Sequence, residues 1–339
     1  MAKGTDAALP QLGLVTPRAG GPAIQKTPKR LKADMSHIVI LNTDSGKGDA
    51  NPDADTIEEL FKARGTPVTI VPVSSGDDLS AKVAQVIEES GVECVVAAGG
   101  DGTICAVAGA LADSGIDLGV LPFGTFNYFA RRFGIPEDAE EAVDAICRGR
   151  GEKIDLGCVN GRVFINNASI GLYPTILKER ESVYQRWGRS RLAAYWSVLV
   201  AMVTVYRPLT MRIEVDGELQ SAKAPTLFVA MSAYQLDEFE IEGADAVRAG
   251  KFAILLAPDV GRFMLVWKAL LVALHDVRKG RDFTLLTGEH ATVEIRRSAR
   301  DVALDGERHR MKAPFKFSIL KDAITVRVPA VASKPDAAE

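Results

Sequence analysis

Several residue types and patterns are scarce in this sequence, and each shortage excludes a class of protein. The 339 residues include only four cysteines and four histidines, and neither set has the spacing of a disulfide framework or a transition-metal site. No apolar run reaches the roughly 20 residues that span a bilayer, and the N-terminal stretch lacks the apolar centre of a signal peptide. We therefore expect a cytoplasmic protein with reduced thiols and no transmembrane helix.

A large excess of positive charge is also absent. The formal net charge is −3, which argues against a broad nucleic-acid-binding face, so no nucleic-acid partner is expected. Hydrophobic residues make up 47% of the chain and charged residues 25%, as in ordinary globular enzymes, and the length favours two domains. Residues 1–35 and 331–339 are predicted to be a flexible leader and tail.

The N-terminal half alternates strand-like and helix-like segments. Apolar runs with the composition of buried strands occupy residues 37–41, 66–73, 92–98 and 117–124. Helical spacing covers Asp53–Ala63, Leu79–Glu89, Ile104–Leu111 and Ala139–Ile146. Because apolar strands separated by helices form parallel sheets covered on both faces, we predict an α/β domain over residues 36–157.

The pattern changes after about residue 155. Short strand-like runs separated by tight-turn residues predict a largely antiparallel, all-β, sandwich-like domain over residues 158–330. Two apolar helical segments, Arg189–Val205 and Arg262–Lys279, are inserted into this domain.

A glycine-rich turn, residues Gly99, Gly100, Asp101, Gly102 and Thr103, follows the third predicted strand. It fits neither the P-loop nor the dinucleotide-binding glycine pattern. Glycines let backbone N–H groups approach phosphate oxygens, and the N-terminus of the following helix favours negative charge. Asp101 would repel a phosphate unless a divalent cation joined them, so the turn predicts a metal–nucleotide phosphate site. The alternative is a tight turn in which Asp101 caps its own helix.

A second glycine-containing stretch, residues 121–136, follows the fourth predicted strand. Ligands of open α/β sheets bind at the carboxyl edge of the strands, and this stretch lies at that edge with the first turn. Thr125 and Asn127 offer side-chain hydrogen bonds there, and Arg131 offers a phosphate or carboxylate contact. In the alternative, Thr125 caps a helix while Phe126 and Phe129 pack in the core.

In this order, the motifs Gly-Gly-Asp-Gly-Thr and Pro-x-Gly-Thr-x-Asn-x-Phe-Ala-Arg resemble the catalytic domain of the diacylglycerol kinase family, which includes sphingosine kinases and bacterial soluble lipid kinases. The resemblance continues in Ile165–Pro174, Ala233–Pro258 and Ala303–Glu307, and covers almost everything from about Ile38 to Pro329. It implies a phosphotransferase with a nucleotide-binding domain followed by a lipid-binding domain. Such an enzyme uses ATP and Mg²⁺ to phosphorylate the hydroxyl of diacylglycerol or of a sphingoid or ceramide-like lipid.

The resemblance also implies a set of nucleotide-binding residues. These are Asn42, Ser74, Gly99, Gly100, Asp101, Gly102, Thr103, Thr125 and Asn127. Asp101 lies near the metal in this alignment and is the predicted metal ligand. Glu307 corresponds to the family's general base, so Asp101 and Glu307 are the predicted catalytic residues. Asp305 would orient Glu307 or the metal.

The tripeptide that contains Glu307 occurs twice. Residues 216–218 repeat the Asp-Gly-Glu of residues 305–307, and Asp-Gly between alternating strands predicts a hairpin turn in both places. Only the later copy has the position expected from the family. We therefore predict that Glu218 is a solvated turn residue.

Three positions depart from the family pattern. Tyr128 stands where relatives often carry aspartate. Arg248-Ala249 replaces an acidic pair that holds a structural Mg²⁺ in some members, so a second metal site is not expected. Met231-Ser232 stands where relatives often carry asparagines, which leaves recognition of the acceptor open.

Candidate partners follow from these patterns. They are a lipid alcohol as substrate, a membrane in transient peripheral contact at its inner face, and a second copy of the chain in a homodimer. The membrane prediction rests on Trp187, Trp196 and Trp267, which lie in or beside the apolar helical segments, although such helices also form ordinary cores. Two alternatives to a lipid kinase remain: an NAD kinase-like phosphotransferase, which shares the Gly-Gly-Asp-Gly turn, and a catalytically inactive nucleotide-binding regulator.

Overall fold

The computed structural model describes residues 36–45, 51–74, 79–88, 91–177, 208–259, 261, 283–296 and 299–330. They fall in one compact unit, Asp34–Glu339. The predicted leader and tail, both inserted helical segments and all three tryptophans lie outside the described residues. Within the described part of the chain, no helix is long and apolar enough to cross a membrane. The four cysteines are free thiols.

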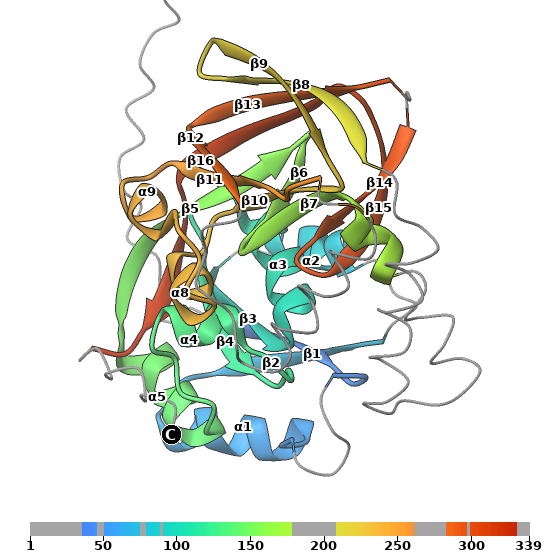
Figure 1. Ribbon diagram of the computed structural model, residues 1–339. Coiled ribbons are helices and arrows are strands. Elements are labelled where there is room, and N and C mark those ends of the chain that lie inside the picture. The colour runs from blue at the N-terminus through green and yellow to red at the C-terminus, as the bar shows by residue number, and fades with distance from the viewer. Residues whose placement is uncertain are drawn as a thin grey trace, which may run out of the picture. The chain divides into compact units, whose positions relative to one another are not determined.

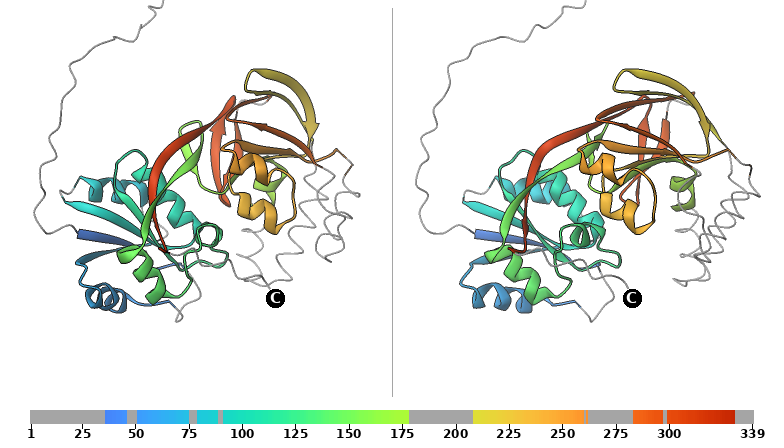
Figure 2. Two further views of the ribbon diagram at one scale, coloured as in Figure 1. Left: turned by 90° about the vertical axis from the view of Figure 1, so that its left-hand side faces the viewer. Right: turned by 60° about the vertical axis from the view of Figure 1, so that its left-hand side comes forward.

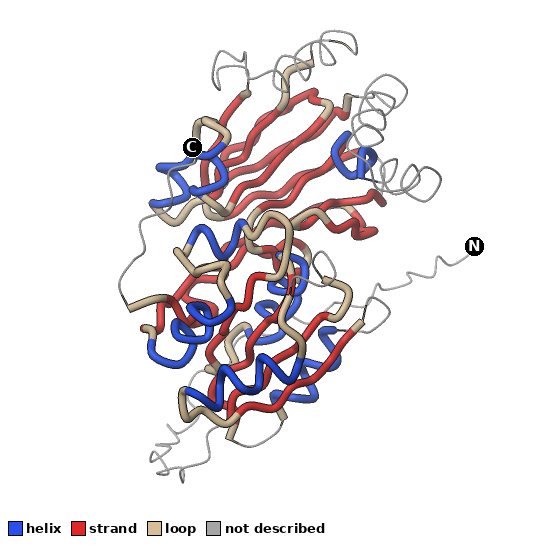
Figure 3. The backbone as a smooth tube through the Cα atoms, turned by 90° about the horizontal axis from the view of Figure 1, so that it is seen from below, coloured by secondary structure: helices blue, strands red, loops and turns tan. Residues whose placement is uncertain are grey.

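The N-terminal part is an α/β layer structure, as predicted. Its elements are β1 (Ser36–Asn42), α1 (Ala54–Ala63), β2 (Val68–Val73), α2 (Leu79–Ile87), β3 (Val92–Gly99), α3 (Asp101–Leu111), β4 (Asp117–Pro122), α4 (Tyr128–Arg132) and α5 (Ala139–Arg148). The strands run parallel in the order β2-β1-β3-β4. Helices α1 and α5 lie against one face of this sheet, and α2 and α3 lie against the other (Figure 1, Figure 3).

Local chemistry explains where these helices begin. The Asp53 carboxylate accepts a hydrogen bond from the backbone N–H of Thr56 at 2.9 Å, so α1 begins at Ala54 with Asp53 as its N-cap. Helix α3 begins at Asp101, three residues before the predicted start at Ile104. The glycine turn is therefore wound into the first turn of α3, with Gly100 as the N-cap.

The C-terminal part is mainly antiparallel and all-β, as predicted. Its elements are β5 (Arg150–Val159), β6 (Arg162–Phe164), β7 (Asn167–Gly171), β8 (Leu209–Val215), β9 (Glu218–Ala224), β10 (Thr226–Ala230), α8 (Ala233–Glu238), α9 (Ala244–Arg248), β11 (Phe252–Leu256), β12 (Thr284–Gly288), β13 (His290–Ile295), β14 (Ala299–Leu304), β15 (Glu307–Lys312) and β16 (Phe315–Val328). A six-stranded sheet has the order β12-β11-β10-β7-β14-β15. Its apolar side chains share one core with those of β8, β13 and the first half of β16.

Strand β16 links the two parts. Its first half pairs with β13, and its second half lies parallel to β4, so a single ten-stranded sheet runs through both parts (Figure 2). Phe315 and Phe317 lie in the sandwich core, whereas Val326 and Val328 lie in the core beneath the parallel strands. The domain boundary predicted at residue 158 stays a prediction. Strand β16 contributes side chains to both cores.

Candidate active site

In the glycine turn after β3, neighbouring atoms occupy the space that a side chain on Gly99 or Gly102 would need. A Cβ atom on Gly99 would lie 2.5 Å from Oγ1 of Thr103, and one on Gly102 would lie 2.5 Å from Oε1 of Glu307. Gly100 packs against Gly124 of the second turn, where an added Cβ would lie 2.7 Å from the Gly100 Cα. The two turns therefore touch backbone to backbone, and Glu307 rests on the first turn of α3.

Asp101 lies at the centre of this contact. Its carboxylate accepts hydrogen bonds from the backbone N–H groups of Phe129 at 3.0 Å and Tyr128 at 3.3 Å, and from Nδ2 of Asn166 at 3.4 Å. Asp101 is therefore not the N-cap of its own helix, because Gly100 holds that position and the carboxylate binds the start of α4 instead. Its partners are all donors, and a carboxylate with about four lone-pair sites keeps capacity for a further ligand.

The other predicted nucleotide-binding residues lie at the carboxyl ends of neighbouring strands. Asn42 ends β1, and its Nδ2 donates to Oγ1 of Thr103 at 2.9 Å. Ser74 follows β2, and Thr125 follows β4; both are exposed. The strand order β2-β1-β3-β4 brings these residues to one edge of the sheet, while their roles in binding stay predictions.

Asn127 and Arg131 differ from that group. Asn127 has 3% of its surface exposed and a left-handed backbone, with φ at 51°. Its Oδ1 accepts from the Gly124 N–H at 2.9 Å and its Nδ2 donates to the Pro122 carbonyl at 3.2 Å, so the amide shapes its own turn. Arg131 pairs with Glu137 at 3.2 Å. Neither is among the described residues that line the two cavities below.

Asp305 anchors the turn that carries Glu307. Its carboxylate accepts the backbone N–H groups of Ile165, Asn166 and Asn167 at 2.7, 2.8 and 2.9 Å. Burial raises the pKa of Asp305 to about 6, although these three N–H groups act to lower it. Asp305 thus fixes the β14–β15 turn to the segment at the start of β7, while its role in orienting Glu307 or a metal stays a prediction.

Glu307 lies between two cavities of about 650 and 640 Å³. Both cavities are lined by Gly102, Asp305 and Glu307. The first cavity extends along α3 to the start of α2 and is also lined by Ser80, Ala106, Arg162 and His309. The second cavity is also lined by Asp101, Thr125, Asn166 and Gln235, and by a set of apolar and aromatic side chains.

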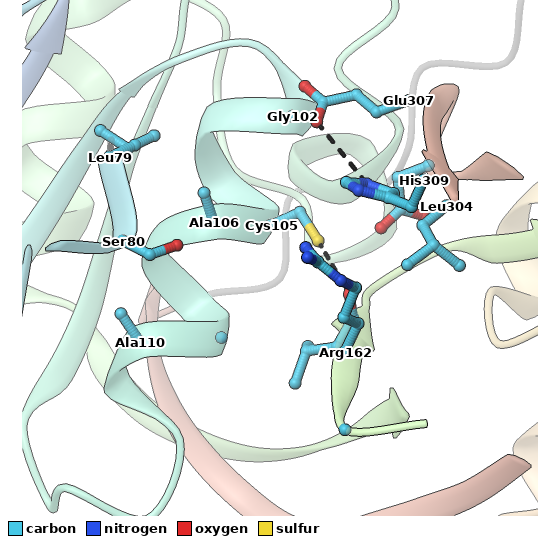
Figure 4. Close-up of a pocket in the computed structure, with 14 residues that line it drawn as sticks. Leu79, Ser80, Gly102, Cys105, Ala106, Ala110, Arg162, Leu304, Glu307 and His309 are labelled. Atoms are coloured by element: carbon cyan, nitrogen blue, oxygen red, sulfur yellow. Dashed lines mark hydrogen bonds and ion pairs between the residues drawn. The ribbon is translucent and has the colours of Figure 1, made fainter. Parts of the chain in front are cut away.

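Arg162, His309 and Asn166 were missed by sequence reasoning. His309 Nε2 lies 4.0 Å from Oε2 of Glu307, across from Gly102 and Cys105 in Figure 4. Burial and the Arg162 guanidinium hold the pKa of His309 below its usual range, against the effect of Glu307. Asn166 is buried, and its Oδ1 has no hydrogen-bond partner among the described residues. No pattern marks Arg162 or His309, because folding alone brings them to Glu307, whereas Asn166 lies within the quoted stretch Ile165–Pro174.

The departures from the family pattern have local explanations. Arg248 binds the carboxylates of Asp237 and Asp245. The guanidinium group of Arg248 therefore lies in the segment for which no second metal site is predicted. Ser232 is buried, and its Oγ caps α8 by accepting from the Gln235 N–H. Within the described residues, no group of three or more His, Cys, Asp or Glu side chains is placed to hold a metal ion.

Comparison with known proteins agrees with the motifs. Residues 36–159 match the family model of the diacylglycerol kinase catalytic domain. The chain is 32% identical over 198 residues to a diacylglycerol kinase of Bacillus subtilis (strain 168), covering 57% of this chain and 64% of the relative. It is 30% identical over 208 residues to a diacylglycerol kinase of Staphylococcus aureus (strain JH9), covering 57% and 61%. The matched part of the chain thus spans about six tenths of the length of these relatives.

The fold is shared with solved structures. A crystal structure of a diacylglycerol kinase from Bacillus anthracis str. Sterne aligns with a TM-score of 0.65. The alignment covers 88% of this chain and 98% of that one, at 20% sequence identity. The family model and the curated relatives confirm the resemblance inferred from the sequence motifs, and this structure shows the fold.

Proposed function

Since residues 36–159 match the family model of the diacylglycerol kinase catalytic domain, we propose that the chain is a lipid kinase that transfers the γ-phosphate of ATP to a lipid hydroxyl. One observation carries this proposal: two cavities of similar size meet at Gly102, Asp305 and Glu307. A transfer between two substrates needs such a meeting point, with a proton acceptor on the boundary.

The first cavity is the proposed donor side. It runs along α3 from Gly102 to Ala110 and to the start of α2, and it reaches the glycine turn at Gly102. The backbone N–H groups of the bare turn and the N-terminus of α3 favour phosphate oxygens there. A Cβ atom on Gly102 would meet Glu307, and one on Gly124 would meet Gly100, so neither turn has room there for a side chain.

Asp101 is the proposed Mg²⁺ ligand. It is partly exposed, lines the second cavity beside Gly102, and has only hydrogen-bond donors as partners. Mg²⁺ is commonly held by one or two carboxylates together with substrate phosphates, so a site without a cluster of acidic residues fits this ion. When bound, the ion would neutralise charge on the phosphates during transfer.

The second cavity is the proposed acceptor side, and Glu307 is the proposed general base. The acceptor oxygen forms a bond to the γ-phosphorus while the bond from that phosphorus to the β-phosphate oxygen breaks and ADP leaves. The hydroxyl proton passes to the Glu307 carboxylate. Asp305 holds the turn at three backbone N–H groups, which keeps this carboxylate against Gly102.

The test is a labelled-ATP assay with purified protein and a panel of alcohols. The panel contains 1,2-dioleoylglycerol, sphingosine, ceramide, undecaprenol and NAD, each with Mg²⁺ and with EDTA. We expect Mg²⁺-dependent label in a lipid product and none in NADP. Label in NADP alone would favour the NAD kinase-like alternative, and ATP binding without any product would favour the inactive regulator.

A further inference from the structure

Three aromatic side chains form a rim on the second cavity. Phe126 and Tyr128, from the turn after β4, stack with ring centroids 5.6 Å apart and planes 4° from parallel. Phe239, at the end of α8, lies 6.4 Å from the Tyr128 ring. All three line the cavity, and we call them the aromatic rim. Tyr128 is the residue that departs from the family's usual aspartate.

The aromatic rim is exposed to an unusual degree. Phe126 is 60% exposed and Phe239 is 54% exposed, and only Leu219 and Phe283 join them as exposed large hydrophobic residues in the described part of the chain. The alternative in which both phenylalanines pack in the core is therefore wrong for Phe126, whereas Phe129 is fully buried. Contiguous exposed apolar surface on a monomer commonly marks a binding site.

Apolar surface continues from the rim toward the reacting groups. Phe228, Leu236 and Ile241 line the same cavity, and Asp101 and Glu307 lie at its polar end. We infer that the aromatic rim binds the hydrocarbon chain of the acceptor lipid, at the part of the chain nearest the hydroxyl that is phosphorylated. This inference rests on the proposed lipid kinase function and assigns the contacts that select the acceptor.

The charged residues around the aromatic rim favour binding of a single lipid chain over docking on an anionic bilayer surface. Phe239 lies near the exposed carboxylates of Glu238 and Glu242, whereas the Asp237 carboxylate is paired with Arg248. No lysine, arginine or histidine is among the described residues that line this cavity. An anionic bilayer or a phosphorylated headgroup would be repelled here, so the occupant is the chain of an uncharged or cationic lipid.

The experiment measures chain binding separately from catalysis. The probe is N-phenyl-1-naphthylamine, an uncharged apolar fluorophore, titrated into wild type, Phe126→Ala, Phe239→Ala and the double variant. Leu219→Ala is the matched control, because Leu219 is 58% exposed on β9 and does not line the cavity. We expect the Kd of the double variant to rise about tenfold, with the control unchanged.

Kinetics and sedimentation complete the test. In the double variant we expect the KM for dioctanoylglycerol to rise about tenfold while the KM for ATP stays constant. The inference is overturned if wild type does not bind the probe, or if the double variant binds it as wild type does. It is also overturned if the double variant loses only sedimentation with phosphatidylcholine–phosphatidylglycerol vesicles, since the rim would then dock on a bilayer. Absence of kinase activity in wild type would instead refute the proposed function.

Discussion

Two Asp-Gly-Glu turns in this chain have almost the same backbone and very different surroundings. Asp216 and Gly217 have φ values of 48° and 90°, and Asp305 and Gly306 have values of 47° and 88°. In both turns the aspartate accepts backbone N–H groups from a neighbouring segment. The tripeptide therefore determines the hairpin and its anchoring in the same way in both places.

Their positions in the fold make the two turns chemically different. The N–H groups of His290 and Glu289 hold the pKa of Asp216 below its usual range, whereas burial raises that of Asp305 to about 6. Glu307 rests on Gly102 and lines both cavities, while Glu218 lines neither. The turn motif alone does not distinguish the two glutamates, and the proposed catalytic role of Glu307 rests on its placement beside the N-terminus of α3.

The largest expected effect is that of Glu307→Gln. The change keeps the size and the turn but removes the base, so turnover should fall about 10²–10⁴-fold. Nucleotide binding should persist, because the substitution removes a negative charge and leaves the glycine turn intact. Steady-state phosphorylation and calorimetric titration of ATP measure the two effects. Wild-type turnover in this variant would remove Glu307 from the chemistry.

Gly102→Ala should separate activity from stability. The new Cβ would lie 2.5 Å from Oε1 of Glu307, so the partly exposed carboxylate must move. We expect turnover to fall about ten- to a hundredfold through misplacement of the base. The Tm should stay the same or rise, because alanine favours a helix over glycine. Adding Glu307→Asp, with its shorter side chain, should restore part of the activity; a fully active Gly102→Ala enzyme would contradict the close contact.

The two aspartates should affect stability over different pH ranges. The folded-state pKa of Asp305 lies above its ordinary 3.8, so its contribution is present at low pH and is lost as the pH rises toward about 6. The pKa of Asp216 is lowered, so its contribution is present above the ordinary value and is lost as the pH falls. Asp305→Asn should flatten the stability profile between about pH 4 and 6, and Asp216→Asn the profile at more acidic pH. Urea unfolding of both variants across this range measures the profiles, and identical profiles would refute the contrast.

The smallest expected effect is that of Glu218→Gln. Glu218 is exposed at the start of β9 and lines neither cavity, so turnover should stay within about a factor of two of wild type. The same phosphorylation assay serves as the control for Glu307→Gln. If Glu218→Gln were inactive, the reaction would take place at the turn of residues 216–218, and the proposed site at Glu307 would be wrong.

Local features of the fold could be predicted from the sequence. The strand–helix alternation and the Asp-Gly hairpins depend on nearby residues, and both are present in the structure. The continuation of β16 into the N-terminal sheet was not predicted, because it pairs Val326 with Leu118 across more than half of the chain. Such pairing depends on packing between distant segments, which no local pattern encodes.

The candidate site shows the same limit. The residues at the strand ends could be chosen because parallel strands bring their carboxyl ends to one edge. The direction of each side chain could not be predicted. Asn127 turns inward with a left-handed backbone, whereas Phe126 turns outward. Helix α4 has only five residues, too few for a periodic pattern to separate buried from exposed positions. Arg162 lies on β6 of the ten-stranded sheet and His309 on β15 of the six-stranded sheet, and neither belongs to a motif.

Strand β16 also affects the order in which this protein can fold during synthesis. The ribosome completes β4 about 200 residues before the part of β16 that covers its edge, and Arg327 bonds Asp117 at a separation of 210 residues. Until then the nascent chain holds a parallel sheet with an open apolar edge, a surface that favours association with other chains. Strand β16 therefore acts as a closing element, and the N-terminal sheet reaches its final form only after the chain has emerged through Val328.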